Sequence, residues 1–178
     1  SKRVFFSFHY QDVMDFRANV VRNSWLTKPN RDVAGFYDAS IWESAKKTGS
    51  VAIKRLINQG IRNTSNTCVL VGSETYSRPW VRYEILKSFV KGNHIFAVGI
   101  NSIKGKDGRV KPKGLNPLHF VGVTYALDGK SYTLHQKVNG NWFKYSEVDG
   151  KSTFPCHAPV ERRGTVSYTH LTLPTTIA

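Results

Sequence analysis

A tryptophan and a glutamate four residues apart, Trp80 and Glu84, are the residues of this sequence best suited to chemistry. They follow an apolar run that ends at Gly72-Ser73, and a helix opening at Pro79 would place both on one face. In open α/β sheets, ligands bind outside the carboxyl ends of the strands, where this turn would lie. A carboxylate beside a large aromatic ring suits a ligand made of a sugar and a flat base. A structural role also fits, because the helix dipole favours an acid in the first turns whatever the function.

Four short apolar runs predict the strands that would position this pair. They alternate with helical patterns, which favours a parallel, doubly wound α/β sheet flanked by helices. The expected strands are Val4–Phe8, Gly35–Asp38, Thr67–Val71 and Ile95–Ile100.

Three helices are expected around this sheet. The first begins at the N-cap residue Asp12 and carries apolar residues three and four apart. The second is expected from Ser50 to Gly60, and the third from Pro79 to Gly92, where the glycine would end it.

The pattern changes after Asn101. A basic loop from Lys104 to Pro117 is followed by short β-rich runs separated by Asx-Gly pairs, which are strong hairpin signals. The strands expected in this small antiparallel meander are Val121–Leu127, Tyr132–Lys137 and Asn141–Tyr145. We therefore expect an α/β domain over residues 1–117 and a C-terminal antiparallel β elaboration of it over 118–160.

Residues 161–178 are expected to form a tail that contributes little to the fold. The stretch from Gly164 to Ala178 has no helical periodicity and no capping residues. It resembles read-through of a cloning junction more than a natural C-terminus, so it is set aside in the functional interpretation.

The formal net charge of the 178 residues is +14, which favours phosphate-bearing or polyanionic ligands. The positive charges concentrate between Lys104 and Lys113, in a stretch rich in Gly and Pro. That stretch fits a solvated loop as well as a contact with phosphate or nucleic acid.

The two cysteines indicate a reducing compartment rather than a disulfide framework. Cys68 lies in the most apolar strand and is expected to be a small buried hydrophobe. The sequence has no Cys-x-x-Cys and no His pair at metal-ligand spacing, so no metal site is expected. It also has no apolar run of about 18 residues and no secretion signal, which predicts a cytoplasmic protein with no membrane span.

Four features occur in the order found in TIR domains. A first strand leads into the turn Ser7 to Asp12 (SFHYQD), a middle strand ends in Gly72-Ser73, and then Ser77, Trp80 and Glu84 complete a Ser…Ser…Trp-x-x-x-Glu pattern. The sequence resembles a TIR domain, and more closely the divergent ThsB-like branch of the Thoeris antiphage defence system. The likeness runs from Lys2 to about Pro117 and includes GFYDASIW and NSIKGKDG. Two parts of the sequence depart from common TIR domains: Phe8-His9-Tyr10 in the first turn, and the β-rich region after Phe120.

This resemblance implies a flavodoxin-like fold and cleavage of the bond between nicotinamide and ribose in NAD. In the defence branch, the product is a cyclic ADP-ribose isomer that activates a separate NAD-consuming effector. NAD is then a substrate, and no cofactor is expected. The implied partners are this effector, reached by a diffusible nucleotide signal, a phage-derived trigger and further copies of the chain; membranes and nucleic acid are not expected.

Glu84 is the expected catalytic residue, because the family relies on a Glu and the reaction needs a carboxylate near the ribose. Trp80 is expected to stack on a flat ring and exclude water. The other expected substrate-binding residues are Ser7, Phe8 and His9 in the first turn, Asp38 and Trp42 in a loop over the site, and Ser77. Simpler roles stay open for three of them: an exposed loop position for His9, packing for Trp42 and a turn for Ser77.

Three other classes of function compete with this interpretation. A non-enzymatic TIR-like adaptor would use the same motif residues for its fold and act by assembly. A receiver-type phosphoacceptor would need clustered carboxylates for magnesium, which Asp12 and Asp38 do not clearly supply. A nucleic-acid binder would use the basic loop, and its binding would depend steeply on salt.

Overall fold

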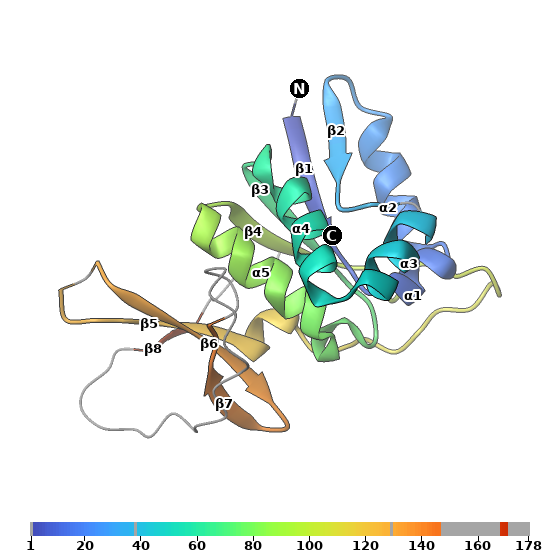
Figure 1. Ribbon diagram of the computed structural model, residues 1–178. Coiled ribbons are helices and arrows are strands. Elements are labelled where there is room, and N and C mark those ends of the chain that lie inside the picture. The colour runs from blue at the N-terminus through green and yellow to red at the C-terminus, as the bar shows by residue number, and fades with distance from the viewer. Residues whose placement is uncertain (1, 38, 129, 147–167, 171–178) are drawn as a thin grey trace.

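The structure, a computed structural model, describes residues 2–37, 39–128, 130–146 and 168–170. Its centre is a four-stranded sheet in the order β2-β1-β3-β4 (Figure 1). The strands are β1 (Lys2–Ser7), β2 (Arg31–Ala34), β3 (Asn66–Val71) and β4 (His94–Gly99). All neighbouring pairs in this sheet are parallel, so the predicted parallel α/β fold is confirmed.

Helices cover both faces of this sheet (Figure 1). They are α1 (Tyr10–Met14), α2 (Arg17–Leu26), α3 (Ala39–Thr48), α4 (Ser50–Arg62) and α5 (Pro79–Lys91), with the 3₁₀ turns η1 (Thr75–Ser77) and η2 (Pro117–Phe120). Side chains alternate between the faces of a strand. Phe5 and Val69 therefore join the core formed with α4 and α5, whereas Phe6 and Leu70 join the core formed with α2.

The prediction of a strand at Gly35–Asp38 is wrong, because the second strand ends at Ala34. Gly35 has a φ of +91°, and a Cβ there would lie 2.2 Å from the carbonyl oxygen of Phe6. The chain turns at this glycine, which packs tightly against β1. Asp38 itself lies outside the described residues.

The single helix predicted after Asp12 is two helices. Phe16 adopts a left-handed conformation with a φ of +66°, and this breaks the helix between α1 and α2. Asp12 is not an N-cap but a buried residue within α1. Its carboxyl lies against Gly72, where a Cβ would come within 2.3 Å of an Asp12 oxygen.

The helix predicted at 50–60 extends to Arg62, and Gly60 does not end it. A Cβ at Gly60 would lie 2.2 Å from the Tyr37 hydroxyl and 2.9 Å from the Phe5 ring. This glycine lets α4 approach the sheet closely. By contrast, α5 ends as predicted, at Gly92 in a left-handed conformation with a φ of +83°.

A second, antiparallel sheet in the order β7-β6-β5-β8 follows the first one. Its strands are β5 (Val121–Tyr125), β6 (Tyr132–Val138), β7 (Asn141–Lys144) and β8 (Tyr168–His170). Asn139 and Gly140 both have positive φ, as a tight hairpin turn requires. The predicted C-terminal β elaboration is confirmed, with strand ends that differ by a few residues.

The second sheet shares a core with α5. Val121, Val123 and Leu134 pack in the same buried cluster as Val81 and Ile85. At the edges of this contact, Phe89 meets Tyr132 edge to face at 5.7 Å, and Arg82 Nε donates to Gln136 Oε1 at 3.2 Å. The elaboration therefore stabilises the position of α5.

Most of the predicted tail, residues 161–178, lies outside the described residues. Its described part, β8, pairs with β5 through Gly122 to Thr124. Whether the tail contributes to stability stays a prediction.

The basic loop is attached to the domain through a buried arginine. Arg17 is only 1% exposed and donates to the carbonyl oxygens of Ile103 at 3.0 Å and Arg109 at 2.7 Å. Asp15 completes the junction by pairing with Arg17 at 2.9 Å and with Lys111 at 2.5 Å. The hydrogen bonds from Lys111 and Gln11 lower the pKa of Asp15. Within the described part of the chain, no helix has the length and apolar character that a membrane span needs.

We predict that Gly60→Ala destabilises the protein, although Ala normally stabilises a helix by about 1 kcal/mol relative to Gly. The added methyl group must displace the Tyr37 hydroxyl and the Phe5 ring, and overpacking of this kind typically costs about 1–3 kcal/mol. Denaturant unfolding measures the change in the free energy of unfolding. Gly99→Ala is the control, since its Cβ would meet nothing closer than Asn101 Oδ1 at 3.5 Å. A Gly60→Ala protein as stable as the wild type would contradict the close approach.

Candidate functional site

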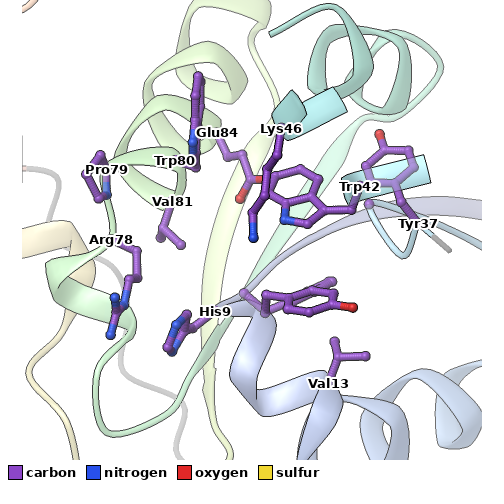
Figure 2. A pocket seen from close by; sticks show the side chains of 13 residues that line it. His9, Val13, Tyr37, Trp42, Lys46, Arg78, Pro79, Trp80, Val81 and Glu84 are labelled. Carbon is purple, nitrogen blue, oxygen red and sulfur yellow. The ribbon is translucent and has the colours of Figure 1, made fainter. Parts of the chain in front are cut away.

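A cavity of about 260 Å³ opens between α5, α3 and the turns that follow β1 and β2 (Figure 2). Three stretches far apart in the sequence form its walls, namely residues 8–13, 35–46 and 78–84. The lining residues are Phe8, His9, Tyr10, Val13, Gly35, Tyr37, Trp42, Lys46, Arg78, Pro79, Trp80, Val81 and Glu84. The cavity thus lies at the carboxyl edge of the parallel sheet, where ligands bind in such folds.

Glu84 presents its carboxyl group to this cavity from the second turn of α5. Its side chain is nearly sealed from bulk water, with the residue 7% exposed. The Ser7 hydroxyl, at the end of β1, donates a hydrogen bond of 2.5 Å to Glu84 Oε2. Burial raises the pKa of Glu84 to about 8, and the hydrogen bond from Ser7 opposes this rise. Burial therefore favours the protonated form of the Glu84 carboxyl group at neutral pH.

Two indoles flank the carboxyl group. Trp80 lies one turn before Glu84 on α5, as the spacing predicts, and packs edge to face on Tyr83 at 5.8 Å. Trp42 comes from α3, on the opposite wall (Figure 2). Its Nε1 is buried and has no hydrogen-bond partner among the described residues, so it is free to donate to a ligand.

Two cations line the same cavity. Lys46 follows Trp42 by one turn of α3 and pairs with Glu43 at 3.1 Å. Arg78 immediately precedes α5 and uses one terminal nitrogen to pair with Glu74 at 2.8 Å, while its Nε is buried without a partner among the described residues. Burial and, to a smaller extent, Arg78 lower the pKa of His9, so this imidazole is neutral at pH 7.

The structure brings together most of the predicted site residues. Phe8, His9, Trp42, Trp80 and Glu84 all line the cavity. Trp42 lies on a helix rather than on the expected loop.

Ser7 and Ser77 occupy other places than predicted. Ser7 lies behind the wall, fully buried, where it touches Glu84 instead of lining the cavity. Ser77 is exposed in η1 and donates to the Glu74 carbonyl oxygen at 2.9 Å, which is a turn role.

Sequence reasoning did not assign the side chains of Tyr10, Tyr37, Lys46 and Arg78 to the cavity. The four-residue spacing of Trp42 and Lys46 would have indicated a shared face, had a helix been predicted there. Tyr37 could not be found in this way, because its hydroxyl is placed by a 2.8 Å hydrogen bond to the Leu56 carbonyl oxygen on α4. Within the described ranges, no group of three His, Cys, Asp or Glu side chains is placed to hold a metal ion.

The chain is similar to known proteins over much of its length. Residues 5–104 match the family described as "Thoeris protein ThsB, TIR-like domain". The chain is 57% identical over 148 residues to a protein of Bacillus cereus (strain MSX-D12) named "Putative cyclic ADP-D-ribose synthase ThsB1". The match covers 83% of this chain and 77% of that protein.

We predict that Glu84→Gln changes how stability depends on pH. In the unfolded chain, the Glu84 carboxyl loses its proton near its ordinary pKa of 4.5, whereas the folded protein holds it to about pH 8. The neutral Glu84 therefore makes its full contribution to the free energy of unfolding below about pH 4.5. This contribution is lost as pH rises toward 8. Glutamine does not ionise, so Glu84→Gln has no such loss. The free energy of unfolding of the variant minus that of wild type should therefore rise by about 1.4 kcal/mol per pH unit over that range.

Chemical denaturation at several pH values between 5 and 8 measures this slope. Asp128→Asn is the control. Backbone and side-chain hydrogen bonds lower the pKa of Asp128, so this residue changes the pH dependence of the free energy of unfolding only below pH 5. A stability difference between Glu84→Gln and wild type that is flat from pH 5 to 8 would show that Glu84 is ionised in the empty cavity.

Proposed function

Because this chain belongs to the TIR-like domain family of the Thoeris protein ThsB, we propose that it cleaves NAD and makes a cyclic ADP-ribose signal. The observation that carries the proposal is the placement of Glu84, a buried carboxyl group that opens on a cavity walled by two indoles. The name of the Bacillus cereus relative supports the same product class.

The bond that breaks joins the nicotinamide nitrogen to the anomeric carbon of ribose. Nicotinamide leaves as a neutral molecule with the electron pair of that bond, so it needs no general acid. The ribose carbon becomes an oxocarbenium ion, whose positive charge a nearby carboxylate stabilises. Glu84 supplies this carboxylate.

Substrate binding itself can ionise Glu84. An opposite charge within a few ångströms favours the charged form of an acid, and the nicotinamide ring of NAD is a cation. Burial favours the neutral form of Glu84, because burying the neutral acid costs less free energy than burying the carboxylate. The arriving cation then lowers the pKa of Glu84, which releases its proton to solvent water as the substrate binds and becomes the carboxylate that the reaction needs.

Exclusion of water decides between a cyclic and a linear product. Attack on the oxocarbenium ion by a nucleophile of the same ADP-ribose molecule closes a ring and releases one proton. Attack by water gives linear ADP-ribose and also releases one proton. Trp80 and Trp42 cover the reacting carbon and favour the internal nucleophile.

Three donors are available for the polar parts of the substrate. Lys46 and Arg78 supply positive charge for the pyrophosphate, since charge-assisted hydrogen bonds to phosphate are strong. The buried Nε1 of Trp42 and Nε of Arg78 need acceptors, which phosphate or carboxamide oxygens provide.

In the cell, the protein would act as the signalling enzyme of an antiphage system. A phage-derived trigger, acting in the cytoplasm, switches on a latent activity, and self-assembly of the chain accompanies the switch. The diffusible product then activates a separate effector. Hydrolysis of NAD to the linear product accompanies cyclisation.

We predict that Glu84→Gln abolishes NAD turnover while the protein stays folded. The amide keeps the size of the side chain but carries no charge, and losing one electrostatic stabiliser typically costs about 10²–10³ in rate. The measurement is mass analysis of the products formed from NAD with lysate of phage-infected cells as activator. Asp32→Asn, an exposed acid of β2 paired with Arg3, is the matched control and should leave turnover unchanged. Wild-type turnover in Glu84→Gln, together with normal signalling in cells, would favour the adaptor function.

We also predict that Trp80→Ala shifts the products toward linear ADP-ribose. Removing the indole opens the cavity to water beside Glu84, so water competes better with the internal nucleophile. Chromatography with mass detection gives the ratio of linear to cyclic product. Trp80→Phe keeps a flat ring and should hold this ratio near the wild-type value, and an unchanged ratio in Trp80→Ala would contradict the role of Trp80.

A further inference from the structure

Ser7 differs from the other predicted binding residues because it touches the reacting group and not the cavity. It is the last residue of β1, where the register pairs it with Val69 of β3. It is fully buried and does not line the cavity. A ligand in the cavity would therefore meet Glu84 and not Ser7.

The Ser7 hydroxyl is the hydrogen-bond partner that the described part of the chain provides for Glu84. It donates to Oε2 at 2.5 Å, across 77 residues of sequence. No Lys or Arg of the described residues forms an ion pair with Glu84. The bond thus runs from the central sheet to α5, and it holds Glu84 Oε2 on the protein side.

We infer that Ser7 is a positioning residue for Glu84: its hydroxyl fixes the carboxyl group toward the cavity and favours its ionised form. This inference rests on the proposed function only for its effect on NAD turnover. Its effect on Glu84 itself can be measured without turnover.

The physical basis is a donor aimed at one oxygen of a buried acid. An alcohol that donates to a carboxylate stabilises the charged form, and it also restricts rotation of the carboxyl group. The other titratable side chains that line the cavity around Glu84 come from four places in the surrounding fold. They are His9 and Tyr10 after β1, Tyr37 after β2, Lys46 on α3 and Arg78 before α5. The substitution Ser7→Ala changes none of these residues, so the effect of the hydroxyl can be isolated.

Ser7→Ala should raise the pH at which Glu84 ionises by about one to two units, because hydrogen bonds to charged groups are typically that strong. Without the donor, the decline of stability with pH should extend above pH 8, and this extension should vanish when Glu84→Gln is also present. The measurement is the free energy of unfolding of wild type, both single variants and the double variant between pH 5 and 10. An extension that persists in the double variant, or no extension in Ser7→Ala, would overturn the inference.

The same variants give a second readout in the activated protein. Ser7→Ala should lower kcat/KM for NAD at pH 7 by about 10-fold or more, with the acid limb of the pH–rate profile moved to higher pH. Ser7→Thr keeps the hydroxyl and should restore most of the rate and the position of that limb. Ser24→Ala, an exposed serine of α2, is the matched control.

The two proposals fail in different ways. If activated wild type does not turn over NAD, the proposed function fails, and the unfolding experiment still decides the role of Ser7. If wild type turns over NAD but Ser7→Ala has the same pH–rate profile, Ser7 is only a packing residue of β1. A uniform loss of activity without a shift of the profile, not rescued by Ser7→Thr, would also reject the positioning role.

Discussion

The Glu84 carboxyl group is removed from water, and no cation in the described part of the chain forms an ion pair with it, so the surrounding structure must tolerate a buried acid. A buried, unpaired charge is among the most costly features that a fold can contain, so burial raises the pKa of Glu84 and favours its neutral form. One short hydrogen bond from Ser7 stabilises the ionised form of Glu84 and so limits the rise of its pKa. That bond forms only if β1 and α5 are held at a fixed distance, and the rest of the domain maintains that distance.

Helix α5 is held from both sides. Residues two apart on a helix point about 200° apart, so Arg82 lies roughly opposite Trp80 and Glu84. Trp80 and Glu84 face the cavity, while Arg82 is buried and bonds to Gln136 of the second sheet. The C-terminal elaboration therefore acts as a support for the wall that carries the acid. A change in how that sheet packs would be transmitted to Glu84 through a single rigid element.

The parts of the fold that local sequence encodes could be predicted, and the parts set by close contacts could not. The strand Thr67–Val71 and the helix from Pro79 to Gly92 carry their own signals, namely continuous apolar residues and a proline start with a glycine stop. The neighbouring sequence predicts a strand at Gly35 and a helix end at Gly60. In the structure, Gly35 instead packs against the backbone of Phe6, and Gly60 packs against Phe5 and Tyr37. The sequence offers little sign of α3, because most of its described side chains are exposed to solvent.

The same distinction applies to the site. Trp80 and Glu84 were found because one helix face carries both, whereas Lys46, on α3, meets them only through the tertiary fold. Together these residues give the empty cavity two cations and a largely neutral acid. A dinucleotide offers the opposite pattern, with two negative phosphates and one cationic ring. Under the proposed function, the phosphates would pair with Lys46 and Arg78, and the cationic ring would stabilise the ionised form of Glu84.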